Sequence, residues 1–303
     1  GVATLVLEGA DAEGAAAAYE AGRAYFALEP RLKGCPGCSR RNITEGFQRG
    51  YIPFAAESGL AAVREVKEGF CYGLEWPAGR QQRHPFQAAN VWPPVEALER
   101  LGASWREAMD GFLDLSVRAA RAVADALSST LEAGSADELE ALLRGGETIS
   151  QMRMFNYLPA RLANAAEGET LLGSSPHTDW HALTLILRDR GSRLQYRNKA
   201  SGDWVNVTVG GQSELVLLVG DWLSMFSGGA LHSAAHRVVL PDVDDSSLAF
   251  VYFHYPGPDA RLPRRGPWLR RTGEELNTVD DGMFELTWGE YVVKKWREVM
   301  SNR

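Results

Sequence analysis

Short apolar segments fill the chain from Thr148 to Tyr255, and they limit the fold more than any other feature of the sequence. Strands are predicted at 149–157, 182–187, 193–197, 204–209, 214–219, 234–240 and 248–255. Glycine, aspartate and asparagine separate these segments, and near-regular spacing of this kind is typical of a sandwich or barrel. The sequence therefore predicts a mainly β protein with a barrel core of about 110 residues.

The segments on either side of this core have other patterns. A buried strand is predicted at 2–7, helices at 10–27, from 104, from 135 and at 287–300, a basic loop at 31–50 and irregular chain at 51–94. Ser104 and Glu107 have the form of a capping box at the start of the clearest helix. We expect one domain over 1–303, with a mostly helical part at 1–147, the core at 148–256, and a C-terminal extension and helix at 257–303.

Composition excludes some classes of protein. The net charge of −7 argues against an extended basic surface for nucleic acid, and no apolar run approaches the ~20 residues of a membrane span. Three cysteines without a signal peptide fit a reducing, cytoplasmic compartment better than a disulfide scaffold. Cys35 and Cys38 have no second Cys/His pair at zinc-finger spacing, so we expect a surface turn with two thiols. We expect a monomer with a small-molecule partner.

Two histidines and an aspartate form the most informative pattern. His177 and Asp179 are two residues apart, so on a strand their side chains would point to the same face. His236, from a distant strand, would complete a three-ligand face with open coordination positions. This arrangement is typical of non-haem Fe(II) oxygenases, which need the open positions for O2 and a second molecule.

Other histidine assignments remain open on these residues alone. His181 continues the alternation of His177 and Asp179 and is a rival ligand, although a place in the pocket wall suits it better. His232 and His236 have the spacing of two zinc ligands one helical turn apart. No glutamate follows His232 as it would in a zinc-protease helix, and Val238 favours a strand after His236.

Further motifs follow one another along most of the chain. They are Tyr25-Phe26-Ala27-Leu28, Gly50-Tyr51-Ile52-Pro53, Lys67-Glu68-Gly69-Phe70, Asn90-Val91-Trp92-Pro93, Arg153-Met154-Phe155-Asn156-Tyr157, His177-Thr178-Asp179-Trp180-His181, Gly220-Asp221-Trp222-Leu223, Ser233-Ala234-Ala235-His236-Arg237-Val238 and Thr287-Trp288-Gly289-Glu290-Tyr291. With these motifs the sequence resembles the isopenicillin-N-synthase-like branch of the Fe(II)/2-oxoglutarate-dependent oxygenases. By this resemblance a leading strand and helix of relatives would lie before Gly1, so a shortened or truncated member is expected.

The resemblance implies both a fold and a reaction. The fold is a double-stranded β-helix (jelly-roll) core, with Fe(II) held by His177, Asp179 and His236. The co-substrates are 2-oxoglutarate and O2, with ascorbate as a further reductant, and the products include succinate and CO2. Related halogenases have a small residue in place of Asp179, so its carboxylate favours hydroxylation, desaturation or ring closure of a small organic substrate.

The sequence departs from the family at the 2-oxoglutarate site. The family usually carries an Arg-x-Ser pair after the distal histidine, where the arginine binds the far carboxylate of 2-oxoglutarate. Here Ser247 fits the serine, but the arginine position falls on Asp245 or Ser246. The tyrosine that assists is Tyr157 or Leu158, depending on a one-residue offset. The expected co-substrate contacts are therefore Ser247, Asn156 and Tyr157, with Arg188, Arg153 and Arg237 as candidate replacement cations.

Fold analogy predicts the substrate pocket, in the mouth of the barrel. Its walls are expected to come from the 31–50 loop, the C-terminal helix, and Phe155, Trp180, His181, Tyr196 and His254. Two alternatives to the 2-oxoglutarate-dependent enzyme remain. One is a 2-oxoglutarate-independent Fe(II) oxidase of the same fold, which the missing arginine would permit. The other is a catalytically silent barrel that binds a small molecule.

Overall fold

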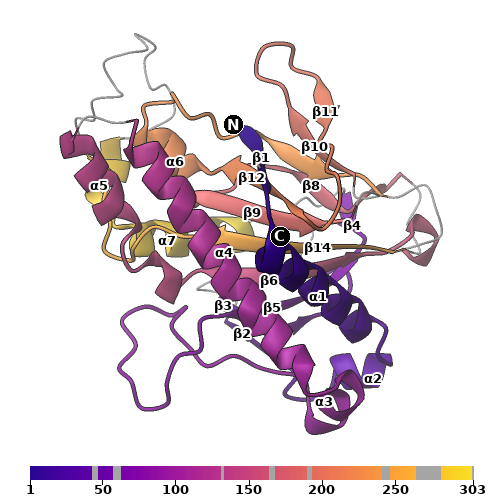
Figure 1. Ribbon diagram of the computed structural model, residues 1–303. Coiled ribbons are helices and arrows are strands. Elements are labelled where there is room, and N and C mark those ends of the chain that lie inside the picture. Colours follow the sequence, from indigo (N-terminus) through magenta and orange to yellow (C-terminus); the bar gives the residue numbers. More distant parts are fainter. Residues whose placement is uncertain are drawn as a thin grey trace.

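Two antiparallel sheets form the centre of the structure, a computed structural model (Figure 1). The structure describes residues 1–42, 47–56, 63–130, 133–163, 168–189, 193–240, 246–263 and 281–301. The strands of these ranges are β1 (Val2–Val6), β2 (Ser39–Asn42), β3 (Phe47–Ile52), β4 (Val63–Glu65), β5 (Lys67–Gly73), β6 (Gln151–Tyr157), β7 (Thr170–Leu172), β8 (Ser174–His177), β9 (Leu183–Arg188), β10 (Leu194–Arg197), β11 (Trp204–Asn206), β12 (Glu214–Val219), β13 (His236–Val238) and β14 (Ser247–His254). The helices are α1 (Gly9–Phe26), α2 (Pro30–Lys33), α3 (Val95–Leu101), α4 (Ser104–Ser128), α5 (Ala133–Leu143), α6 (Asp221–Phe226) and α7 (Trp288–Ser301).

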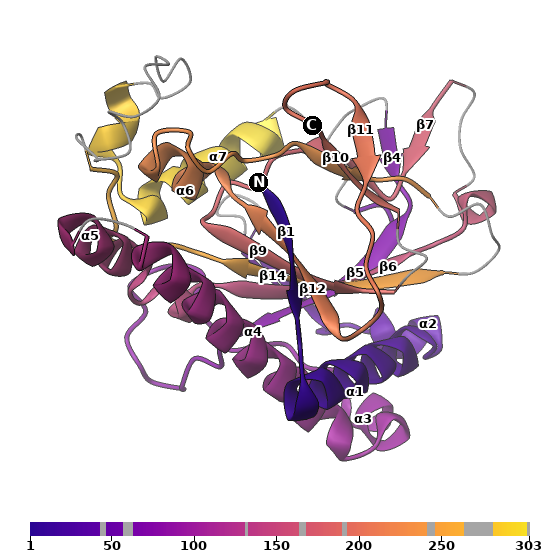
Figure 2. The same ribbon diagram turned by 45° about the horizontal axis from the view of Figure 1, so that its top comes forward.

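The first strand, β1, and the last strand, β14, lie in the same sheet. Within the described residues, the larger sheet runs β1-β12-β9-β14-β6-β5-β3-β2 and the smaller runs β11-β10-β13-β8. The two sheets face each other, and β4 and β7 pair in parallel beside them. Helices α1 and α4 lie across the outer face of the larger sheet (Figure 2).

Alternation along the central strands separates two apolar clusters. In β14, Leu248 and Phe250 join the cluster under α1 and α4, whereas Ala249 and Val251 join the cluster between the two sheets. Successive strand residues point to opposite faces, so each central strand is buried on both sides. This explains why β5, β6 and β9 are buried along their whole length. The site described below lies on the inner side.

Helix α1 approaches the sheet closely at one glycine. A Cβ atom at Gly22 would lie 2.8 Å from ring carbons of the fully buried Phe250, whereas a Cβ at Gly14, on the same helix, would meet nothing within 4 Å. We expect Gly22→Ala to lower the free energy of unfolding by about 1–2 kcal/mol, because the crowding outweighs the better helix propensity of alanine. The control Gly14→Ala should raise it by about 0.5–1 kcal/mol. Urea unfolding measures both, and equal effects of the two substitutions would contradict this packing.

The strands predicted from Thr148 onward are confirmed, but the first part of the chain differs from the prediction. Strands β2 to β5 occupy stretches predicted as loop or irregular chain. The charged residues of these strands interrupt the apolar pattern that would predict a strand. Lys67 and Glu68 of β5 are nevertheless buried, because Lys67 pairs with Glu65 and Glu68 pairs with Lys33. The 31–50 stretch includes residues 43–46, which lie outside the described ranges.

Two local predictions near the N-terminus were wrong. The strand at 2–7 was expected to be buried, but β1 is at the edge of its sheet and Val6 is 69% exposed. The capping box at Ser104 does not form. Helix α4 begins there, but the residue before it, Ala103, is itself in helical conformation, and no side chain caps the helix.

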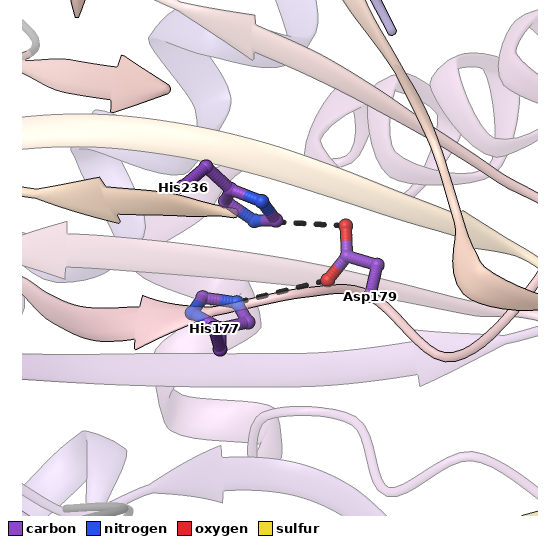
Figure 3. Close-up of side chains that lie close together, drawn as sticks. All are labelled: His177, Asp179 and His236. Carbon is purple, nitrogen blue, oxygen red and sulfur yellow. Dashed lines mark ion pairs between the residues drawn. The ribbon is translucent and has the colours of Figure 1, made fainter. Parts of the chain in front are cut away.

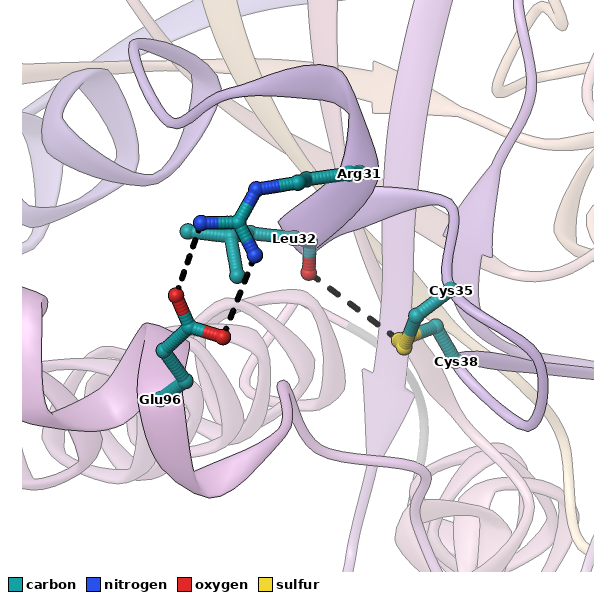
Figure 4. Close-up of a disulfide and its surroundings, with 5 residues drawn as sticks. All are labelled: Arg31, Leu32, Cys35, Cys38 and Glu96. Carbon is teal, nitrogen blue, oxygen red and sulfur yellow. Dashed lines mark hydrogen bonds and ion pairs between the residues drawn. A yellow bond between two sulfur atoms is a disulfide. The ribbon is translucent and has the colours of Figure 1, made fainter.

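Cys35 and Cys38 are also bonded differently from the prediction. They were expected as two thiols, and the structure joins them in a disulfide with Cα atoms 5.2 Å apart (Figure 4). The disulfide follows α2, where Arg31 makes two hydrogen bonds to Glu96 of α3. Among the described residues, the helices are all too short or too polar to cross a membrane.

Candidate metal and co-substrate site

His177, Asp179 and His236 come together between the two sheets (Figure 3). His177 ends β8 and His236 begins β13, and the two are register partners in this strand pair. The Nε2 atoms of His177 and His236 each lie 3.7 Å from a different oxygen of Asp179. One ligand atom from each residue lies within 4.8 Å of the others, so the three can reach a single metal ion.

Asp179 is not on the strand with His177, as the i, i+2 spacing predicted. It lies in the turn after β8, and the first turn of α6 holds this turn through its backbone. The Asp221 N–H donates to the Asp179 carbonyl at 2.7 Å, and the Thr184 hydroxyl donates to the Asp179 carboxylate. The approach is so close that a Cβ on Gly220 would lie 1.9 Å from the His181 carbonyl oxygen. The carboxylate is therefore oriented by backbone contacts and a hydroxyl.

The electrostatics of this cluster leave its donor atoms ready for a cation. Burial alone would raise the pKa of Asp179, but attraction from His236, His181 and His177 and the Thr184 hydrogen bond lower it to about 2. Burial lowers the pKa of His236 to about 4, against the opposing pull of Asp179. At neutral pH the aspartate is therefore ionised and His236 is neutral, the forms in which both groups bind metals. Two imidazoles and one carboxylate suit Fe(II) with open positions.

Two cavities meet at this cluster. The larger, about 300 Å³, and the smaller, about 50 Å³, share five residues of their walls: Phe155, Ser174, His177, Asp179 and Phe253. Arg188, Tyr157 and Thr184 line only the smaller cavity, which extends into the barrel. A metal ion held by this cluster would therefore border both cavities.

The three candidate replacement cations lie in three different places. Arg188, on β9, is 1% exposed and lines the smaller cavity beside Tyr157. Arg153, on β6, lines the larger cavity. Arg237 follows His236 in β13 and points to the other face of that strand, where its Nε donates to Gln195 and its guanidinium lies 4.3 Å from the Trp204 ring centre.

The other predicted co-substrate contacts also divide. Tyr157 lines the smaller cavity, but Asn156 is on the opposite face of β6 and donates to Glu68. Ser247 donates its hydroxyl to Asp189 at 3.2 Å. Because neighbouring strand residues point to opposite faces, Asn156 and Tyr157 cannot both reach the inside of the barrel. The placement of Asn156 differs from the expectation for this reason.

The larger cavity has a wall different in part from the one expected. Phe155, Trp180 and His181 line it, while Tyr196 and His254 are absent from its lining. His254 is on the helix-facing side of β14 with Tyr252, whose hydroxyl lies 3.2 Å from His254 Nδ1. The described part of the 31–50 stretch contributes no lining residue either.

Sequence reasoning missed several residues of this wall. They are Glu65, Lys67, Ser174, Ser175, Pro176, Thr178, Phe253 and Tyr255. The C-terminal helix was expected in the wall without named residues, and α7 contributes Trp288, Val292 and Trp296. The spacing of Trp288, Val292 and Trp296 on α7 was a usable signal, because residues at i, i+4 and i+8 share one helix face. The family motif at Lys67 did not show that the Lys67 side chain enters the cavity.

The buried His254 makes the stability of the protein depend on pH. Burial lowers its pKa to about 4, below the value near 6.5 of an unfolded chain. The unfolded chain therefore takes up this proton first as the pH falls, and stability is lost between the two values. We expect the loss between about pH 7 and about pH 4.5 to shrink by about 2–3 kcal/mol in His254→Gln. Urea unfolding of the metal-free protein measures it, with the partly exposed His232→Gln as control. If stability falls with pH by the same amount in His254→Gln as in the unmodified protein, His254 is not the source of this loss.

Comparison with known proteins identifies relatives of this chain. Residues 149–256 match the family model of the 2OG-Fe(II) oxygenase superfamily. The chain is 32% identical to the 2-oxoglutarate-dependent dioxygenase citB of Monascus ruber, covering 91% of this chain and 81% of that protein. It is 30% identical to a 2-oxoglutarate-dependent dioxygenase of Didymella fabae, covering 90% of this chain and 82% of that protein.

Solved structures share the fold at lower identity. A full-length Neurospora crassa protein, solved in complex with alpha-KG and thymine, superposes with a TM-score of 0.74 at 18% identity, over 98% of this chain and 87% of that one. A putative 2OG-Fe(II) oxygenase family protein of Caulobacter crescentus has a TM-score of 0.67 at 22% identity, over 98% and 90%. The predicted jelly-roll fold is confirmed. The chain belongs to the 2-oxoglutarate- and Fe(II)-dependent dioxygenases.

Proposed function

We propose that this dioxygenase holds Fe(II) through His177, Asp179 and His236 and oxidises a small organic molecule in the larger cavity. The observation that carries the proposal is the position of the three donor residues, where the two cavities meet. When bound, Fe(II) supplies the O2-activating chemistry of the family, in which 2-oxoglutarate is converted to succinate and CO2. The carboxylate of Asp179 favours hydroxylation, desaturation or ring closure as the outcome.

Arg188 binds the far carboxylate of 2-oxoglutarate in this proposal. Arg188 pairs with Ala249 in the β9–β14 register, so its guanidinium enters the smaller cavity from the strand beside the one that carries the family's arginine. Burial lowers its pKa to about 10, and the side chain is still cationic at neutral pH. One Nη donates to the Val207 carbonyl and fixes the guanidinium. Tyr157, in the same wall, supplies a hydroxyl for the same carboxylate.

The larger cavity accepts the substrate. Six of its lining residues are phenylalanine, tyrosine or tryptophan, and the ring centres of Trp180 and Trp296 lie 5.4 Å apart in edge-to-face contact. Aromatic side chains of this kind exclude water from the oxidised position. Residues 1–303 act as one oxygenase domain in this proposal, because strands and α7 from both ends of the chain complete the sheet and the cavity. We expect a monomer whose partner is a small molecule and not a nucleic acid.

Turnover without substrate tests the proposal. With Fe(II), 2-oxoglutarate and ascorbate, the purified protein should slowly form one succinate for each O2 consumed, because 2-oxoglutarate supplies two of the electrons that O2 takes up and ascorbate supplies the two that a substrate would otherwise give. The same protein treated with a chelator provides the control. O2 consumption without succinate would instead indicate the 2-oxoglutarate-independent oxidase, which the relatives, named as 2-oxoglutarate-dependent enzymes, do not favour.

A further inference from the structure

The two carboxylate oxygens of Asp179 have different surroundings (Figure 3). Oδ1 lies 3.7 Å from His177 Nε2 and 3.9 Å from His181 Nε2, and both distances are longer than a hydrogen bond. Oδ2 lies 3.7 Å from His236 Nε2 and accepts a hydrogen bond from the Thr184 hydroxyl. Of the two oxygens, Oδ2 is therefore the one that a hydroxyl already holds.

Thr184 is fixed in place by the strand that carries it. It lies on β9 inside the larger sheet, opposite Leu218 of β12 and Phe253 of β14, and it is fully buried. A β-branched side chain on a strand has few rotamers, so the hydroxyl cannot easily turn away. Thr184 and His236 both line the smaller cavity. The hydroxyl therefore approaches Asp179 from a rigid element, on the side where 2-oxoglutarate is proposed to bind.

The number of oxygens that Asp179 contributes decides how many positions stay open on a metal ion. Two histidines and one carboxylate oxygen occupy three positions of an octahedral Fe(II) ion and leave three open. A chelating 2-oxoglutarate takes two of these, and O2 needs the last. If both oxygens of Asp179 bound the metal, no position would be left for O2.

We propose that Thr184 is a positioning residue that keeps Asp179 Oδ2 off the metal, so that Oδ1 alone is the ligand and a position stays open for O2. Carboxylates bind metal ions through one oxygen or through both. A hydrogen bond to an ionised carboxylate is strong, and here it competes with the metal for the electron pairs of Oδ2. This inference rests on the proposed function, because it concerns a ligand of the same metal.

Nitric oxide tests the inference, because it binds Fe(II) in the position of O2 without being consumed. It is titrated into the anaerobic Fe(II)–2-oxoglutarate complex, and electron paramagnetic resonance measures the iron–nitric oxide signal. Thr184→Val keeps the shape of the side chain and removes the hydroxyl. We expect this variant to bind Fe(II) within about 3-fold of the unmodified protein, by calorimetry, but nitric oxide at least about 10-fold more weakly. Thr184→Ser should restore the affinity for nitric oxide, because a serine hydroxyl can donate to the same oxygen.

The control is Thr4→Val, at an exposed threonine of the edge strand β1, which should change neither affinity. Equal affinity for nitric oxide in Thr184→Val and in the unmodified protein would overturn the inference. A loss of Fe(II) affinity of more than about 10-fold would also overturn it, because the hydroxyl would then hold Asp179 in place without limiting how it binds. If circular dichroism shows that Thr184→Val does not fold, Thr184→Ala removes the same hydroxyl and takes its place.

The visible band of the Fe(II)–2-oxoglutarate complex reports on the proposed function separately. Its absence from the unmodified protein would refute the proposed function. Its presence, together with unchanged nitric oxide binding in Thr184→Val, would refute only the role of Thr184.

Discussion

Asp179→Ala should abolish Fe(II) binding and 2-oxoglutarate turnover, with a loss of more than about 100-fold in metal affinity. The substitution removes the anionic ligand, and two neutral imidazoles on their own hold Fe(II) weakly. It also takes away the acceptor of the Thr184 hydroxyl. Calorimetry with Fe(II) and succinate formation measure the two losses.

The control for this prediction is Asp110→Ala on α4. Asp110 is a half-exposed aspartate paired with Arg106, so its removal tests the loss of an aspartate outside the site. It should leave both metal affinity and turnover unchanged. If Asp179→Ala folds, by circular dichroism, and still forms succinate at the unmodified rate, Asp179 is not a ligand.

Arg188→Met should raise the KM for 2-oxoglutarate by about 10- to 100-fold, with a smaller change in kcat. In the proposed site the Arg188 guanidinium binds the carboxylate far from the reacting atoms, so we expect its contribution to be to binding. Arg188→Lys should give an intermediate KM, because a lysine keeps the charge without the two-point geometry. Succinate formation at varied 2-oxoglutarate concentration measures the series.

Arg237→Met tests the candidate arginine that follows His236 in the sequence. Its guanidinium lies against Trp204 on the outer face of β13, so the KM for 2-oxoglutarate should stay within about 3-fold of the unmodified value. A large rise in this variant, with none in Arg188→Met, would assign the carboxylate to Arg237. Thermal unfolding of each variant checks that the protein still folds after substitution of the buried Arg188.

The sequence predicted the barrel strands and the metal cluster because both leave local patterns. The apolar runs at 182–187 and 214–219 correspond to β9 and β12, buried on both faces by the helices and the opposite sheet. His177, Asp179 and His236 were identified by residue type and spacing. The residues chosen by spacing do come together, but Asp179 is not on the strand with His177, because it lies in a turn held by α6.

The rest depends on contacts that no local pattern records. Strands β2 to β5 carry charged residues whose partners, such as Glu65 for Lys67, are known only in the folded chain. Arg188 has the sequence context of any strand-end arginine. The pairing of β9 with β14 places Arg188 beside the strand that carries the arginine in the family, and the sequence alone does not show this pairing. The strand register is likewise needed to know which face of the sheet Asn156 and His254 point to.

Anaerobic titration of the metal-free protein with Fe(II) and then with 2-oxoglutarate tests the central claim most directly. The claim is that the His-Asp-His cluster holds iron and that the adjoining cavity holds 2-oxoglutarate against it. It predicts a visible charge-transfer band that saturates at one 2-oxoglutarate per iron and is missing in Asp179→Ala. Iron binding without this band, at saturating 2-oxoglutarate, would contradict the claim.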